Sequence, residues 1–92
     1  MDDTAITKVA EKIRTRRRAL GFTQESFAHH AQLARTYYGR IEQGSQNMAL
    51  KTLFLVAAYL EITPAELLAD VTIDDCRQDD RVAGAETDRQ HD

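Results

Sequence analysis

The chain has 92 residues, 42% of them hydrophobic, and a net charge of −3. A chain of this length has room for one hydrophobic core, and this composition is too apolar for a generally disordered protein. Its longest apolar run, residues 53–60, is far shorter than the roughly 20 residues needed to cross a bilayer. The N-terminus lacks the features of a secretory signal. We therefore expect a single cytoplasmic domain, in which the lone Cys76 stays reduced.

The charge is unevenly distributed along the chain. Residues 1–69 contain nine Lys or Arg and seven acidic residues, whereas residues 70–92 contain three Arg and eight acidic residues. Nucleic acid responds to local potential, so a mildly basic body with an acidic tail is compatible with binding it. We predict one domain over residues 1–73 and an acidic, disordered tail over residues 74–92, where no hydrophobic periodicity is present.

Periodic apolar residues predict an all-α domain of five helices. In the first helix they recur at steps of three, four and seven residues: Ile6, Val9, Ile13 and Leu20. Gly21 suits a helix end, and Thr23 is a good N-cap for a second helix over residues 24–31. A third helix is predicted over residues 35–43, closed by Gly44.

The second and third helices fit a helix-turn-helix, which needs a small residue where the helices pack closest and an apolar residue in the turn. Ala28 and Leu33 occupy these positions, and Tyr38 and Ile41 form the inward face of the third helix. Four of its other side chains are candidate contacts to DNA bases: Arg35, Thr36, Tyr37 and Arg40. Arginine can hydrogen-bond guanine O6 and N7 together, and a threonine methyl can contact thymine.

The fourth helix, predicted over residues 50–60, is the most apolar. We expect it to form the floor of the core through Leu50, Leu53, Phe54, Ala57 and Leu60. The sequence Thr63-Pro64-Ala65-Glu66 is a start signal for a fifth helix. This region holds more apolar side chains than one small core can cover. We therefore predict a homodimer surface made of Leu60, Ile62, Leu67, Leu68 and Val71.

Three segments resemble the lambda-repressor-like (XRE) helix-turn-helix family over about residues 5–70: IRTRRRALGFTQESFA, RTYYGRIEQG and LKTLFLVAAYLEITPAELL. Within that family the chain is most similar to the small controller proteins of restriction–modification systems, in its length, its lack of an effector domain and its Arg-Thr-Tyr opening of the third helix. The resemblance implies a sequence-specific transcription regulator that binds a pseudo-palindromic DNA operator as a homodimer and uses no cofactor.

The resemblance also implies roles for single residues. Three match positions that contact the DNA backbone: Gln24, Asn47 and Lys51. Thr23 caps the second helix, whose exposed amides can meet a phosphate. Arg17 and Glu42 match a partly buried ion pair that joins the first helix to the third. The chain departs from the family where capping or basic residues are common, at Ala34, Ala49 and Gln46.

The sequence leaves two other classes of protein to compare with a transcription regulator. An antitoxin would share this domain and use the tail to bind a toxin. An enzyme is disfavoured because no nucleophile–base set, phosphate loop or metal-ligand spacing is present, and the adjacent His29 and His30 point about 100° apart on a helix. Glu25 could contact RNA polymerase, although the helix dipole also favours an acid there. Three further arginines are expected to be mainly solvated: Arg14, Arg16 and Arg18.

Overall fold

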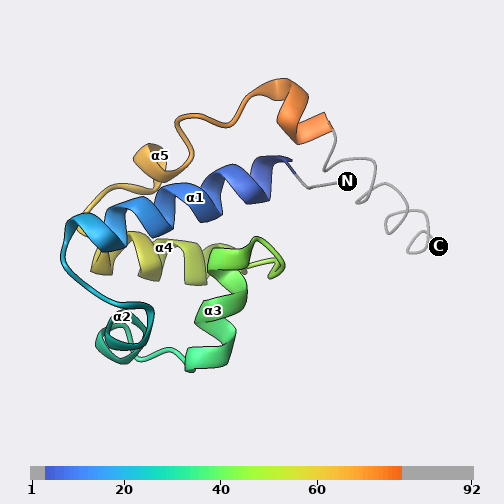
Figure 1. Ribbon diagram of the computed structural model, residues 1–92. Helices are drawn as coiled ribbons and strands as arrows, with labels where there is room; N and C mark the ends of the chain where they lie inside the picture. Colours follow the sequence, from blue (N-terminus) through green and yellow to red (C-terminus); the bar gives the residue numbers. More distant parts are fainter. Residues whose placement is uncertain (1–3, 78–92) are drawn as a thin grey trace.

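The computed structural model describes residues 4–77, which contain helices and no strand. In chain order the helices are α1 Thr4–Ala19, α2 Gln24–His30, α3 Arg35–Gln43, α4 Leu50–Tyr59 and α5 Pro64–Leu67 (Figure 1). The predicted all-α fold with a helix-turn-helix at α2 and α3 is confirmed. Helices α2 and α4 each end one residue earlier than predicted. No helix in this range is both long and apolar enough to span a membrane.

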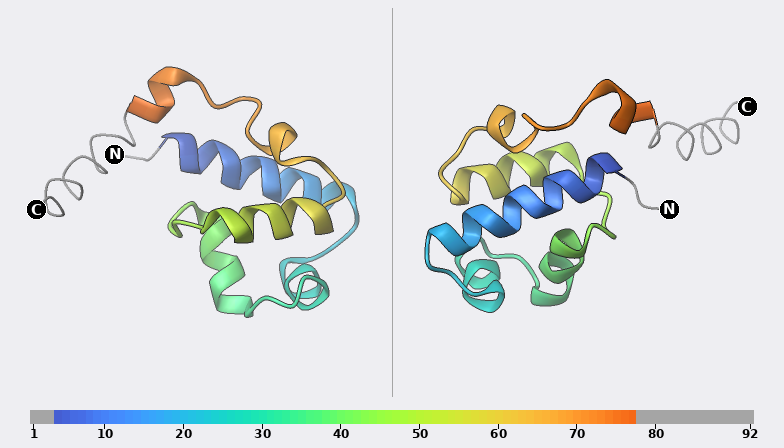
Figure 2. Two further views of the ribbon diagram at one scale, coloured as in Figure 1. Left: turned by 180° about the vertical axis from the view of Figure 1, so that it is seen from behind. Right: turned by 45° about the horizontal axis from the view of Figure 1, so that its top comes forward.

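Helix α1 runs through the middle of the molecule. Helices α2 and α3 lie on one side of it, and α5 with the chain that follows lies on the other (Figures 1 and 2). The largest fully buried apolar side chains come from all five helices and the residue that ends α4: Ile13, Phe27, Tyr38, Ile41, Val56, Leu60 and Leu67. Because α2 and α3 both contribute to this core, their outer faces keep a fixed orientation toward solvent.

Local signals explain where the helices begin and end. Thr23 accepts a hydrogen bond from the backbone N–H of Ser26, and the Ser26 hydroxyl bonds back to the Thr23 N–H, which makes a capping box at α2. The predicted start of α5 at Thr63 has the same arrangement with Glu66. Gly44 closes α3 with a φ of 76°, the left-handed region that favours glycine. Helices α3 and α4 begin without a side-chain cap.

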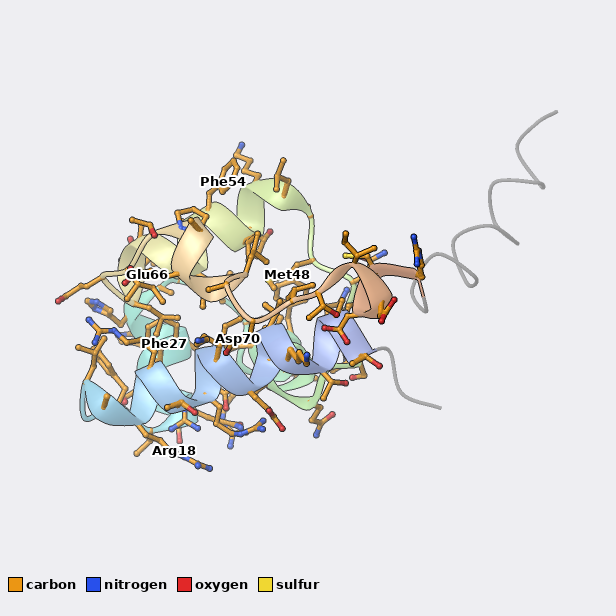
Figure 3. All side chains as sticks on the ribbon, turned by 90° about the horizontal axis from the view of Figure 1, so that it is seen from above. Arg18, Phe27, Met48, Phe54, Glu66 and Asp70 are labelled. Carbon is orange, nitrogen blue, oxygen red and sulfur yellow. The ribbon has the colours of Figure 1, made fainter. Side chains whose placement is uncertain are left out.

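Two arginines of α1 bind the C-terminal ends of other helices and are not simply solvated. Arg14 donates to the carbonyl of Glu42 at 2.7 Å, in the last turn of α3. Arg16 donates to the carbonyl of Leu60 at 2.8 Å, at the end of α4. A cation is favoured at a helix C-terminus because the last carbonyls lack intrahelical partners. Arg18 is exposed as expected and lies at the outer edge of the molecule (Figure 3).

The buried face of α4 differs from the prediction. Leu53, Val56 and Ala57 are buried, whereas Leu50 is 65% exposed and Phe54 is 50% exposed. Figure 3 shows Phe54 on the side of α4 that faces away from α1. The expectation that Leu50 and Phe54 form the floor of the core is therefore wrong. The helix is apolar on both sides, so its sequence did not distinguish the two faces.

The chain after α5 folds back along α1. Residues 73–77 form a further helical turn, so the prediction of a disordered tail from residue 74 is wrong for its first four residues. Thr72 caps this turn by accepting from the Asp75 N–H at 3.1 Å, and the Asp75 carboxylate accepts from the Thr72 N–H at 2.8 Å. Asp75 also forms an ion pair with Lys8 at 2.8 Å. These partners lower the pKa of the Asp75 carboxyl below its ordinary value. The rest of the predicted tail lies outside the described residues.

Candidate nucleic-acid interface

Helix α3 presents a polar outer face opposite its buried side. Arg35, Thr36 and Arg40 are exposed, while Tyr37 is half-buried and packs against the core with part of its ring. Tyr38 and Ile41 are buried on the inner side, as predicted. The structure therefore places the four predicted base-contact residues along one short helix whose inner side is anchored. Long polar side chains on such a helix can reach base edges in the major groove.

The predicted ion pair between Arg17 and Glu42 is present and buried. Arg17 Nε lies 2.7 Å from Glu42 Oε2, and Arg17 Nη2 lies 2.9 Å from Glu42 Oε1, which is the two-point arginine–carboxylate geometry. The residues are 6% and 2% exposed. Glu42 also accepts from the Tyr38 hydroxyl and, at 3.0 Å, from Gln24 Nε2. We call these four residues the Glu42 cluster, and it joins α1, α2 and α3.

Charge and burial fix the protonation states within the Glu42 cluster. Burial on its own would raise the pKa of the Glu42 carboxyl, but hydrogen bonds from Arg17 and Tyr38 lower it below its ordinary value. Burial, followed by the bond to Glu42, raises the pKa of Tyr38. Glu42 therefore remains an anion and the Tyr38 hydroxyl remains a donor at neutral pH. The cluster has one stable hydrogen-bonding pattern, which holds α3 against α1.

The lowered pKa of Glu42 predicts a loss of stability in acid. A carboxyl with a depressed native pKa contributes stability that is complete above its unfolded-state pKa, about 4.3. This contribution is lost as pH falls through the lower native pKa. Thermal unfolding should therefore show wild type melting above Glu42→Gln by a constant margin at about pH 6 to 8, with the margin shrinking below about pH 4. A margin that stays constant down to pH 3 would contradict the assignment.

The residues expected to contact the DNA backbone surround α3. Thr23, Asn47 and Lys51 are exposed, whereas Gln24 is half-buried and its amide nitrogen donates to Glu42. An amide nitrogen carries two hydrogens, so Gln24 can donate one to Glu42 and offer the other to a phosphate. Gln46, a neutral residue at a loop position where the resembled family commonly has a basic one, accepts a hydrogen bond from Arg40 Nε at 3.3 Å.

Two residues of the predicted dimer surface belong to the core of the single chain. Leu60 is fully buried and Leu67 is 1% exposed, so neither side chain is available to a second copy. Ile62 and Val71 are partly buried against the same core. Of the five predicted residues, Leu68 alone is largely exposed, at 41%. The prediction is corrected for Leu60 and Leu67, which belong to the hydrophobic core.

The paired histidines have separate environments. Both histidines are exposed, but His30 stacks on Phe22 with ring centroids 4.9 Å apart and lies 5.0 Å from the ring of Tyr59 in an edge-to-face contact. Within residues 4–77 no three His, Cys, Asp or Glu side chains are placed to hold a metal ion. His30 is thus an aromatic packing partner of the neighbouring rings.

The two packed helices and the polar face of α3 define a helix-turn-helix protein. The HTH_3 helix-turn-helix model matches residues 13–67, so the chain belongs to this family. It is 38% identical over 71 residues to control protein C.MunI from a Mycoplasma species, covering 77% of this chain and 96% of that one. The crystal structure of the restriction–modification controller protein C.AhdI from Aeromonas hydrophila aligns at 35% identity with a TM-score of 0.64, covering 67% of this chain and 94% of that chain.

A second controller protein of known structure was solved with DNA. C.Esp1396I, as a tetramer in complex with its natural 35 base-pair operator, is 35% identical to this chain with a TM-score of 0.63. The alignment covers 68% of this chain and 83% of that one. The alignments cover 96% of C.MunI and 94% of C.AhdI, so the likeness extends over nearly the whole length of these two relatives. Helix-turn-helix proteins of this kind are a class of regulator and not a class of enzyme.

Proposed function

We propose that the protein is a sequence-specific transcription regulator that binds a pseudo-palindromic operator as a homodimer. Its role is that of a restriction–modification controller or a similar small autoregulator. The main support is the exposed polar face of α3, which the buried Glu42 cluster holds in place. Similarity to C.MunI and C.AhdI over almost all of their length supports the same function. A solved relative, C.Esp1396I, is bound to its operator as a tetramer.

The proposed contacts follow from side-chain chemistry and position. Bases would be read by Arg35, Thr36, Tyr37 and Arg40, and the DNA backbone would be held by Thr23, Gln24, Asn47 and Lys51. Few of these groups are cationic, and the chain as a whole is acidic. Specific binding therefore depends on the fit of two recognition helices to two half-sites more than on bulk electrostatic attraction.

The proposed dimer surface is the exposed apolar face of α4 and the end of α5. Leu50 and Phe54 are one turn apart on α4, and Leu50 lines the same apolar hollow as Leu68. Exposed apolar groups that lie together mark interaction sites more often than scattered ones. One recognition helix makes few base contacts, so a second copy supplies the specificity that a small operator-binding protein needs.

The proposed base contacts can be tested on an operator that the wild-type protein selects from random DNA. Arg35→Ala should relax discrimination at one base-pair position per half-site by about 5- to 150-fold, because each good bidentate contact contributes about 1–3 kcal/mol. Lys51→Ala should weaken binding to all sequences equally and reduce the salt slope by about one. Fluorescence anisotropy with a panel of single-base operator variants measures both effects.

Two outcomes would contradict the proposal. If the wild-type protein showed no base preference, the proposed function would be wrong. If Arg35→Ala weakened binding to all operators equally, as Lys51→Ala is expected to do, Arg35 would be a contact to the DNA backbone and not to a base. Cytoplasmic residence, and contact of the exposed Glu25 with RNA polymerase, stay predictions that accompany this proposal.

A further inference from the structure

The loop after α3 folds back onto the last turn of the recognition helix. Ser45 donates to the carbonyl of Arg40 through its backbone N–H at 3.1 Å and through its hydroxyl at 3.3 Å. The next residue, Gln46, accepts from the side-chain Nε of the same arginine at 3.3 Å. Two consecutive loop residues therefore contact Arg40, one at its backbone and the other at its guanidinium.

The contact to Nε decides which edge of the guanidinium faces outward. Arginine has five N–H donors in a planar fork, and the bond to Gln46 occupies the one nearest the stem. The two terminal nitrogens then form the free end of the fork. Such a pair matches the spacing of O6 and N7 on guanine. An untethered arginine on an exposed helix surface samples many rotamers, and binding must first restrict them.

We propose that Gln46 is a positioning residue that presents Arg40 end-on to a guanine. This inference rests on the proposed function, in which Arg40 faces the operator. It also explains the departure at this loop position, where the resembled family commonly has a basic residue. A basic side chain would offer no acceptor to the Arg40 Nε and would repel its charge. With Gln46 the loop lacks a charge that would attract phosphate, but the Arg40 side chain has a fixed orientation.

Four variants test this inference on the operator selected by the wild-type protein. Gln46→Met keeps the length of the side chain and removes the acceptor, and Gln46→Glu keeps an acceptor at the same place. Arg40→Ala identifies the base-pair position that Arg40 reads. The double variant Arg40→Ala/Gln46→Met shows whether the two residues act as a unit. Base preference at every operator position is measured by anisotropy, and melting temperature is measured in parallel.

We expect Gln46→Met to lower discrimination about three- to tenfold at the position that Arg40 reads, since this is the effect of immobilising one long side chain. It should have no further effect when Arg40 is already alanine. Gln46→Glu should keep the preference at that position while binding all operators more weakly, because its charge repels phosphate. The melting temperature should not change, because Gln46 and Arg40 are bonded at the exposed surface.

The inference is overturned if Gln46→Met weakens all operators equally, changes preference at another position, or adds fully to Arg40→Ala. Each of these results would make Gln46 an independent DNA contact. It is also overturned if Arg40→Ala alters no base preference, in which case regulation through Arg35 still stands. A wild-type protein with no base preference would overturn the proposed function and this inference together.

Discussion

Replacing Glu42 with alanine is expected to lower the free energy of unfolding by about 3–5 kcal/mol, because a buried charge loses its partner. The Arg17 guanidinium, in a residue only 6% exposed, would be left without the carboxylate that it contacts at two points. The Tyr38 hydroxyl would lose its acceptor as well. For a domain of this size the melting temperature should fall by at least roughly 10 °C, which thermal unfolding followed by circular dichroism measures.

Two further variants distinguish the loss of the buried ion pair from the loss of a glutamate side chain as such. Glu11→Ala removes an exposed glutamate from α1 and should change stability by less than about 0.5 kcal/mol. Arg17→Met/Glu42→Leu removes both charges and fills the space with apolar groups, so it should be more stable than Glu42→Ala alone. A Glu42→Ala protein that melts within 2 °C of wild type, on the order of the effect of a surface substitution, would show that the Glu42 cluster does not stabilise the fold.

The parts of the fold that the sequence predicted are those with local causes. Thr23 and Thr63 begin helices through hydrogen bonds to residues three positions later, and Gly44 ends one through its own backbone conformation. Such signals lie within a few residues and can be read without knowledge of the tertiary structure. The inward orientation of Tyr38 and Ile41 followed in the same way from helical periodicity.

The parts that the sequence did not predict depend on contacts between distant segments. Arg14 and Arg16 bind carbonyls 28 and 44 residues away, and nothing in a run of arginines identifies those partners. The turn at residues 73–77 is held by Lys8, which lies 67 residues from Asp75. The Glu42 pair was expected only through resemblance to a family, because the spacing of Arg17 and Glu42 carries no signal of its own.

The dimer surface was misjudged for a related reason. An excess of apolar side chains predicts that some remain outside the core, but it does not say which ones. Leu60 and Leu67 fill the core, and the large hydrophobic side chains exposed within residues 4–77 are instead Leu50, Phe54, Leu55, Leu68 and Ile73. The proposed surface therefore shifts from the α4–α5 connection to the outer face of α4 and the end of α5, where Leu50 and Leu68 line the same hollow as Gln46.

Replacing Phe54 with aspartate is expected to convert the protein to a monomer and to lower operator affinity about 10²- to 10⁴-fold, because two linked half-site contacts become one. The Phe54 side chain is half-exposed in the single chain, so the fold tolerates the change while the partner surface does not. A charge placed in an apolar interface lacks both water and a counter-ion. Sedimentation equilibrium gives the oligomeric state, and anisotropy gives the affinity.

Ile73→Asp provides the matched control for this prediction. Ile73 is 71% exposed in the turn that follows α5, so the same apolar-to-acidic change there alters surface composition and net charge equally. It should leave a dimer with wild-type affinity, apart from the small loss that one added negative charge causes. If Phe54→Asp remains dimeric while Ile73→Asp does not, the pairing surface lies beyond α5. The recognition helices would then need a different geometry to reach successive major grooves about 34 Å apart.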